Sequence, residues 1–319
     1  MRANSCIVGS VFWGCSLMST SAFAWDGFGH MEVAAAAWEL MGNSAKSKAV
    51  QLLKVNPQYK TWIKGVSTNK KNKYAFMMAA TWPDYIKGAK GYHSDGPNNG
   101  NTPPPGPQAS QNIGYTDKFM HKYWHFIDEP FTADNSQTTP PATPNAQTQI
   151  AKFRATLPAN SGAKKTVRSY DLVWLLHLVG DVHQPLHATS RFLSDKPDNG
   201  GNAVLVNCDS GVSCEGANKL HAFWDDLLGP NKTTLKEVEH AADKLPMADA
   251  TLASIEDENK WIDESFKAAQ SDVYKSPVGV GLGPFTLTAE YKANAVELAK
   301  QRVALAGVRL ANLLNAAFK

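Results

Sequence analysis

The sequence predicts an all-α fold, a single compact multi-helix domain with one small β-hairpin. Apolar residues recur at helical spacing in several segments, whereas the alternation typical of strands is scarce. Hydrophobic residues make up 43% of the 319 positions and charged residues 19%, which is enough apolar content for one sizeable core. The net charge of +3 is too small to indicate a polyanion-binding protein by itself.

The first 24 residues have the pattern of a secretory signal peptide. Arg2 is their only charged residue, an apolar stretch covers 7–17, and Ala-Phe-Ala stands at 22–24. This stretch is too short to span a bilayer, and it precedes a small-x-small cleavage site. We therefore expect cleavage before Trp25, a mature domain over 25–319, and a periplasmic or secreted protein without stable membrane association. A buried first helix is the alternative interpretation.

Helical periodicity marks most of the mature chain. The first segment, Met31–Met41, is rich in alanine and precedes Gly42, a residue common at helix C-termini. The other segments with apolar residues at helical spacing are 145–157, 167–178, 255–269 and 287–314. The best strand candidate is 203–206, where we expect the hairpin.

Two long segments interrupt the helical pattern. Residues 88–114 are rich in Gly, Pro, Asn and Ser, and residues 130–149 are rich in Pro and Thr. Such compositions are typical of loops. Each segment follows candidate site residues named below, so each is either a lid over a site or a solvated insertion.

Two cysteines remain after the expected cleavage, Cys208 and Cys214. In an exported chain, a close pair is expected to form a disulfide that closes a short loop. A zinc site is the weaker alternative, because no further thiols lie near the pair in the sequence.

Paired histidines and aspartates predict a metal site. His177 and Asp181 are four residues apart, so on a helix both side chains point the same way. A proline then ends or bends that helix, and His187 can turn toward the same pocket. His221 and Asp225 repeat the spacing. Imidazole and carboxylate ligands without thiols indicate a catalytic rather than a structural site, although a plain His–Asp hydrogen bond would explain either pair alone.

The other histidines have more ordinary interpretations. We expect His93 and His240 to be solvated, and His121 and His183 to support the site or the core.

At the expected new N-terminus, the amine and carbonyl of Trp25 can chelate a metal. His30 is close enough in sequence to join them, because intervening glycines allow a tight path.

Together these residues resemble the zinc-dependent, single-strand-specific nucleases of the S1/P1 type, relatives of the zinc phospholipases C. The resemblance runs from Trp25 to Asp225. Its elements are Trp25 with Gly29-His30, Trp82-Pro83-Asp84, Trp124-His125-Phe126-Ile127-Asp128, the segment 177–187, Gly200-Gly201-Asn202, and His221 with Asp225.

The resemblance implies a cluster of three zinc ions held by nine residues. The three ligand sets are Asp84, His125, His177 and Asp181; Trp25, His30 and the shared Asp181; and His187, His221 and Asp225. It further implies an endonuclease that hydrolyses single-stranded DNA and RNA, removes 3′-phosphate from nucleotides, and acts as a monomer. Metal-activated water would attack phosphorus, so no side-chain nucleophile is needed.

Four substrate contacts follow from the same resemblance. Phe126 would stack on a nucleobase, Asp128 would hydrogen-bond that base, Lys87 would neutralise phosphate, and Asn202 would contact substrate beside the metals. Lys87, Asp128 and Asp181 would form the catalytic machinery. The alternative interpretations are a core position for Phe126 and a solvated Lys87.

Two other functions fit parts of the pattern. A phospholipase C is disfavoured, because those enzymes carry Glu where this chain has Asp225 and place the first histidine further from the terminal Trp. A binding protein without catalysis is disfavoured because every expected ligand is present.

Overall fold

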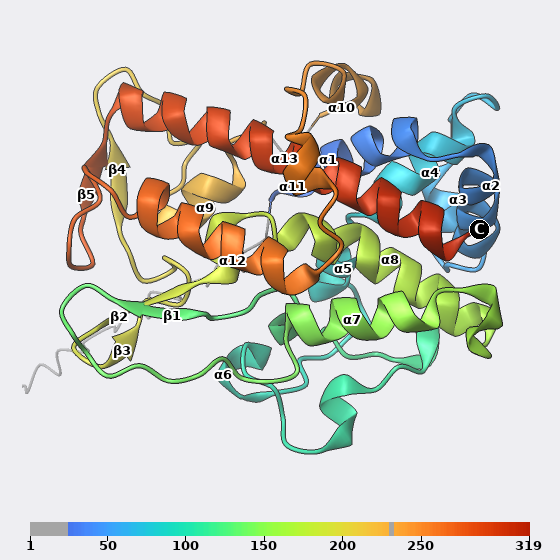
Figure 1. Ribbon diagram of the computed structural model, residues 1–319, viewed down its shortest axis with the longest axis horizontal. Coiled ribbons are helices and arrows are strands. Elements are labelled where there is room, and N and C mark those ends of the chain that lie inside the picture. The colour runs from blue at the N-terminus through green and yellow to red at the C-terminus, as the bar shows by residue number, and fades with distance from the viewer. Residues whose placement is uncertain (1–24, 230–232) are drawn as a thin grey trace, which may run out of the picture.

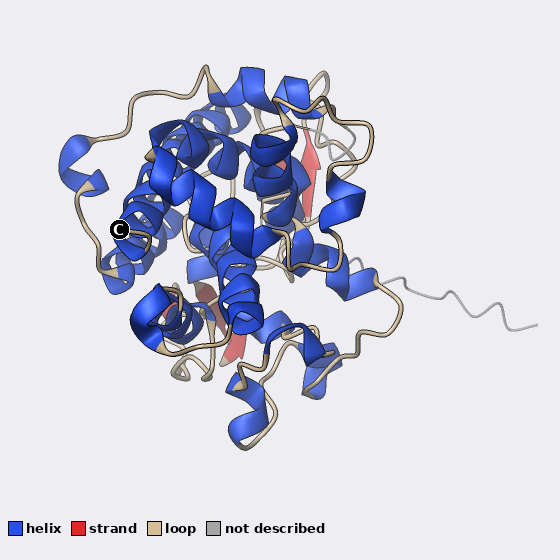
Figure 2. Cartoon of the chain, turned by 90° about the vertical axis from the view of Figure 1, so that its right-hand side faces the viewer, coloured by secondary structure: helices blue, strands red, loops and turns tan. Residues whose placement is uncertain are grey.

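The computed structural model describes residues 25–229 and 233–319, so the predicted signal peptide lies outside the described residues. Most of the described chain is helical, and its strands form two small, separate sheets (Figures 1 and 2). The predicted all-α fold is confirmed.

The bounds of the elements are as follows. The helices are α1 (Gly27–Leu40), α2 (Asn43–Leu53), α3 (Tyr59–Trp62), α4 (Lys71–Ala79), α5 (Trp82–Tyr85), α6 (Pro97–Gly100), α7 (Ala146–Thr156), α8 (Lys165–Asp181), α9 (Leu220–Asp225), α10 (Leu235–Ala242), α11 (Ala250–Ala253), α12 (Glu258–Ala268) and α13 (Ala289–Ala317). The strands are β1 (Pro130–Thr132), β2 (Ser190–Leu193), β3 (Lys196–Pro197), β4 (Val206–Cys208) and β5 (Phe285–Leu287).

Helix α8 forms the centre of the core. Every residue from Ser169 to Asp181 is buried, and α8 lies between α7 and α13 (Figure 1). Helix α1 packs along α13, where a Cβ added at Gly307 would lie 2.7 Å from the Cβ of Ala36. The alanine-rich sequence of α1 thus has a packing purpose, because small side chains let the two backbones approach closely.

Local signals explain where these helices begin and end. Asp26 caps α1 by accepting hydrogen bonds from the amides of Phe28 and Gly29, which would otherwise have no partner. Helix α8 ends at Asp181, four residues before Pro185, which begins a 3₁₀ turn. Gly42 is not the C-terminal glycine that the sequence suggested. It has an extended backbone and precedes α2, while α1 ends at Leu40 and Met41 caps its C-terminus.

The strands differ in place from the predicted hairpin. β2 and β3 form an antiparallel hairpin, and β1 adds to β2 in parallel. The segment predicted at 203–206 contributes to β4, which begins at Val206 and pairs in parallel with β5 rather than within a hairpin. The predicted disulfide joins Cys208 to Cys214, with an S–S distance of 2.05 Å.

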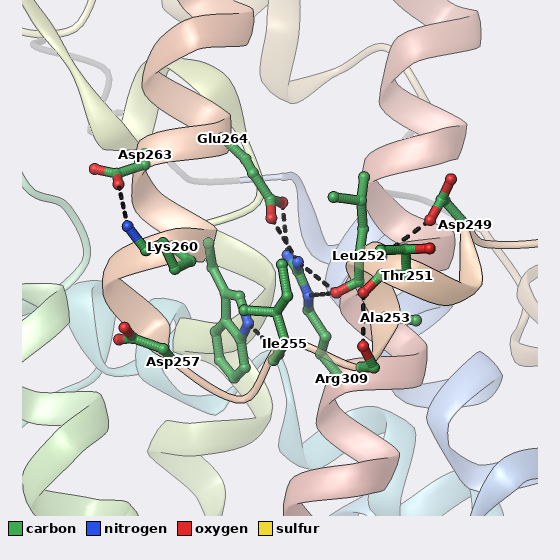
Figure 3. A network of polar contacts seen from close by, with 12 residues as sticks. Asp249, Thr251, Leu252, Ala253, Ile255, Asp257, Lys260, Asp263, Glu264 and Arg309 are labelled. Atoms are coloured by element: carbon green, nitrogen blue, oxygen red, sulfur yellow. Dashed lines mark hydrogen bonds and ion pairs between the residues drawn. The ribbon is translucent and has the colours of Figure 1, made fainter.

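A buried arginine network joins α11, α12 and α13 (Figure 3). Arg309 donates to both carboxylate oxygens of Glu264, at 2.8 and 2.7 Å, and to the carbonyl of Leu252. It also donates to Nε2 of His183, 2.9 Å away, just after α8. Arg302 donates to the carbonyl of the same histidine. The network therefore supports the turn that leaves α8.

Within the described residues, no helix has the length and apolarity needed to cross a membrane.

Candidate metal centre and cleft

The first candidate metal-binding group surrounds the carboxylate of Asp181. From α8, Nε2 of His177 lies 3.3 Å from its Oδ2, and Nδ1 of His125 lies 3.2 Å from the same oxygen. Oδ1 faces the other way, 3.3 Å from Nε2 of His30 in α1. Asp84 in α5 completes the group, with Oδ1 3.6 Å from Nε2 of His177. The two oxygens of Asp181 thus face different donors, which is the geometry a bridging ligand needs.

Gly180 permits the close approach of His30 to α8. A Cβ at this position would lie 3.0 Å from Nδ1 of His30, tighter than about nine in ten real Cβ contacts. The His30 ring also stacks on His177, with centroids 3.7 Å apart. The imidazole is therefore held between the helix backbone and a second ring.

The second group consists of His187, His221 and Asp225. Helix α9 presents the last two at the predicted four-residue spacing, with Nε2 of His221 3.5 Å from Oδ2 of Asp225. Nε2 of His187 lies 3.0 Å from Nε2 of His221. The side-chain amide of Gln184 donates to Oδ1 of Asp225 at 2.7 Å, which orients the carboxylate. Gln184 lies within the 177–187 segment, but its residue type alone did not single it out.

Backbone carbonyls determine the tautomers of these rings. Nδ1 of His187 contacts the carbonyl of His125 at 2.8 Å, and Nδ1 of His221 contacts that of Gly200 at 2.7 Å. His177 makes the same contact with Ala80. A carbonyl only accepts, so each Nδ1 carries the hydrogen and each Nε2 presents a lone pair.

This arrangement fits a bound cation. The lone pairs of His187 and His221 face each other at 3.0 Å, a repulsive contact unless a cation lies between them. Protonation is disfavoured, because burial lowers the pKa of His187 well below its ordinary value and that of His221 to about 4. In the first group, Nε2 of His30 and Oδ1 of Asp181 are buried without hydrogen bonds. Imidazole and carboxylate donors at this density suit zinc or a similar divalent ion.

Trp25 lies at the edge of both groups. Its side chain is fully buried, and Cδ1 would lie 3.9 Å from a Cβ on Gly180. The next amide, that of Asp26, donates to the carbonyl of Asp225 at 3.1 Å. The start of the predicted mature domain therefore lies beside candidate ligand residues from α8 and α9.

A cleft of about 660 Å³ opens onto the candidate metal-binding residues His125, His187 and His221. The four predicted substrate residues, Lys87, Phe126, Asp128 and Asn202, all line it. Lys87 also pairs with Asp84, with Nζ 2.7 Å from Oδ1. Burial, followed by the charge of Asp198, raises the pKa of Asp128 to about 7. The carboxyl group can therefore donate as well as accept a hydrogen bond near neutral pH.

The remaining histidines lie where they were expected. His93 and His240 are exposed. His121 is buried between Asp95 and Asp117, and His183 is buried between the carbonyl of Val179 and Arg309. Neither of these two rings belongs to the metal-binding groups.

The chain is similar to known nucleases along its sequence. The family described as S1/P1 Nuclease matches residues 25–319. Endonuclease 2 of Arabidopsis thaliana is 31% identical over 189 residues, which cover 54% of this chain and 59% of that protein. Endonuclease 5 of the same plant is 28% identical over 167 residues, 46% of this chain and 50% of that protein. The chain thus matches only about half the length of these relatives.

Proposed function

Because the chain belongs to the S1/P1 nuclease family, we propose that it is an exported, zinc-dependent phosphodiesterase that cleaves single-stranded DNA and RNA. We include removal of 3′-phosphate from nucleotides in this proposal. The observation that carries it is the convergence of buried, lone-pair-bearing imidazoles and carboxylates at the base of an open cleft.

The first group would hold two zinc ions and the second group would hold a third. One zinc would be bound by Asp84, His125, His177 and Asp181. The next would be bound by His30, the shared Asp181, and the free amine and carbonyl of Trp25. The third would be bound by His187, His221 and Asp225. The position of Trp25 beside Gly180 and Asp225 supports the second set. Zinc at these places would supply Lewis-acid chemistry, which offsets phosphate charge and makes water a better nucleophile at neutral pH.

The surrounding side chains would bind and orient the substrate. The ammonium group of Lys87, beside Asp84, would contact a phosphate oxygen. Phe126 would stack on a base, a contact worth about 1–3 kcal/mol per base and tolerant of base identity. Asp128 and Asn202 line the same cleft and would hydrogen-bond that nucleotide. Stacking needs an accessible base face, which supports a preference for single strands.

Export to the periplasm or the exterior is part of the proposal. The signal-like sequence of residues 1–24 supports it, and so does the Cys208–Cys214 disulfide, since disulfides persist in oxidising compartments.

The decisive measurement is release of acid-soluble nucleotides from single-stranded DNA by the mature protein. We expect cleavage that a chelator abolishes and added zinc restores, because every proposed reactive contact depends on the metal-binding residues. Magnesium added in place of zinc serves as the control, since imidazole ligands suit zinc better. A zinc-loaded protein beginning at Trp25 that releases no nucleotide would contradict the proposal.

A further inference from the structure

The cleft has a wall that the proposed function does not use. Its residues are Asn98, Asn99, Asn101 and Thr102, all from the long 88–114 loop, together with Lys122. The proposed base contacts, Phe126 and Asp128, line the same cleft.

The residues of this wall have a defined conformation that internal contacts hold in place. Asn98 and Asn99 have positive φ angles of 52° and 56°, a backbone region in which asparagine is enriched. The side-chain amide of Asn98 donates to the hydroxyl of Thr102 at 2.8 Å. A Cβ at Gly96 would collide with the carbonyl of Thr102, so the turn closes on itself tightly.

The wall is also fastened to the segment that carries the site. The amide of His121 donates to Oδ1 of Asp95 at 3.0 Å, and the hydroxyl of Tyr123 donates to Oδ2. Burial lowers the pKa of His121, but its hydrogen bonds to Asp117 and Asp95 outweigh burial and raise it overall. A charged His121 would thus hold Asp95 close to the chain that continues into His125 and Phe126.

Lys122 adds a positive charge to this wall. Its Nζ donates to the carbonyl of Asn99 at 3.0 Å, which uses one of three ammonium hydrogens. Burial, followed by the charge of Lys87, lowers its pKa. The positive charge of Lys87 thus disfavours the charge on Lys122, and both side chains line the cleft. An anion that extends from Lys87 toward Lys122 would relieve this repulsion.

We propose that Asn99, Asn101, Thr102 and Lys122 form a second nucleotide subsite, which binds the nucleotide across the scissile phosphate from the base held at Phe126. This inference rests on the proposed nuclease function. Carboxamide and hydroxyl groups both donate and accept, so they suit the hydrogen-bonding edges of an unpaired base. Lys122 contacts the flanking phosphate. The protein accordingly binds oligonucleotides more tightly than mononucleotides.

The test measures binding to the zinc-loaded mature protein. Fluorescence anisotropy gives Kd for a labelled, cleavage-resistant decanucleotide with phosphorodithioate linkages, and competition gives Kd for a mononucleotide. We expect Lys122→Gln to raise Kd for the decanucleotide about tenfold, because a charge-assisted contact is lost. The slope of log Kd against log salt should fall by about 0.7. The mononucleotide should be affected much less.

Matched variants separate the subsite from general effects. In Lys122→Gln, the new side chain can still donate a hydrogen bond to the carbonyl of Asn99. Lys122→Arg should restore most of the decanucleotide binding, because it keeps the positive charge. Asn101→Ala should raise Kd for the decanucleotide about threefold. Lys90→Gln removes an exposed lysine of the same loop outside the cleft and should bind like wild type.

Two outcomes are distinguishable. Folded Lys122→Gln and Asn101→Ala variants that bind the decanucleotide like wild type would overturn the subsite, even if wild type cleaves DNA. Failure of wild type to cleave single-stranded DNA would instead overturn the nuclease proposal, and the binding comparison would still decide whether this wall contacts nucleic acid.

Discussion

At the scale of single residues, Gly180 has no side chain, and this allows the ring of His30 to lie close to α8. A Cβ at this position would stand 3.0 Å from Nδ1 of His30 and 3.4 Å from its Cε1. The ring cannot simply retreat, because it stacks on His177. Within α8, glycine lowers helix stability by about 1 kcal/mol relative to alanine, so its presence here needs a reason.

We predict that Gly180→Ala weakens zinc binding about tenfold or more, since it displaces a proposed ligand while favouring the helix itself. Competition with a chromophoric chelator measures the affinity. Gly42→Ala is the matched control, because its added Cβ would meet only Asn315 at an ordinary 3.7 Å. Equal zinc affinity in Gly180→Ala and wild type would show that His30 is not a ligand.

Residue spacing predicted part of this centre. His177 with Asp181 and His221 with Asp225 lie on helices, as the four-residue separation indicated. The sequence could not reveal that Ala80 and Gly200 accept hydrogen bonds from ligand rings, because a carbonyl has no residue signature. The same holds for Lys122, whose relation to Asn99 depends on the tertiary path of the loop.

At the scale of elements, one arginine joins four parts of the chain. Arg309 of α13 contacts Glu264 of α12 and Leu252 of α11 (Figure 3), and it also contacts His183 after α8. Its own exposure is 1%, and removing it takes two hydrogen bonds from the largely buried carboxylate of Glu264, which then keeps that of Arg302. A half-exposed pair, Lys260 with Asp263, lies on the same α12 and offers a direct comparison (Figure 3).

We predict that Arg309→Met lowers the free energy of unfolding by about 3 kcal/mol, because two charge-assisted hydrogen bonds to a largely buried carboxylate are lost. Lys260→Met should change it by about 0.5 kcal/mol or less, because solvent screens that pair. Urea denaturation followed by circular dichroism measures both. If both variants lose a similar amount of unfolding free energy, the Arg309 network stabilises the fold no more than a surface ion pair does.

Prediction at this scale succeeded where the signal is local. The helices expected at 167–178 and 287–314 are present as α8 and α13, with ends displaced by a few residues. The strand near 203–206 has its partner at Phe285–Leu287, a pairing that local alternation cannot indicate. The role of Gly42 was predicted wrongly, because the sequence cannot distinguish an extended glycine that precedes a helix from a left-handed glycine that follows one.

At the scale of the whole molecule, the two candidate metal-binding groups join distant segments. They combine side chains from α1, α5, α8 and α9 with those of the connecting turns, from His30 to Asp225. Facing lone pairs and buried carboxylates oppose one another unless a cation is present. Metal binding should therefore stabilise the whole fold, and not only the cleft.

We predict that chelation lowers the melting temperature by about 5 °C or more. A ligand present at 100 times its Kd contributes about 2.7 kcal/mol, and a domain of this size shifts by about 2 °C per kcal/mol. Differential scanning calorimetry with and without chelator provides the measurement, and added zinc should reverse the shift. An unchanged melting temperature after verified metal removal would show that these groups are stable without a cation.

The carbonyl partners of the ligand rings also bear on how this centre withstands mutation. A carboxylate that orients a histidine can be lost through one codon change, whereas a main-chain oxygen survives any replacement that keeps the chain path. Position 80 can therefore vary among residues of alanine's size without altering the His177 tautomer. Position 200 has less freedom, because its φ of +61° favours glycine. Descendants of this sequence should thus retain the glycine at 200 more strictly than the alanine at 80.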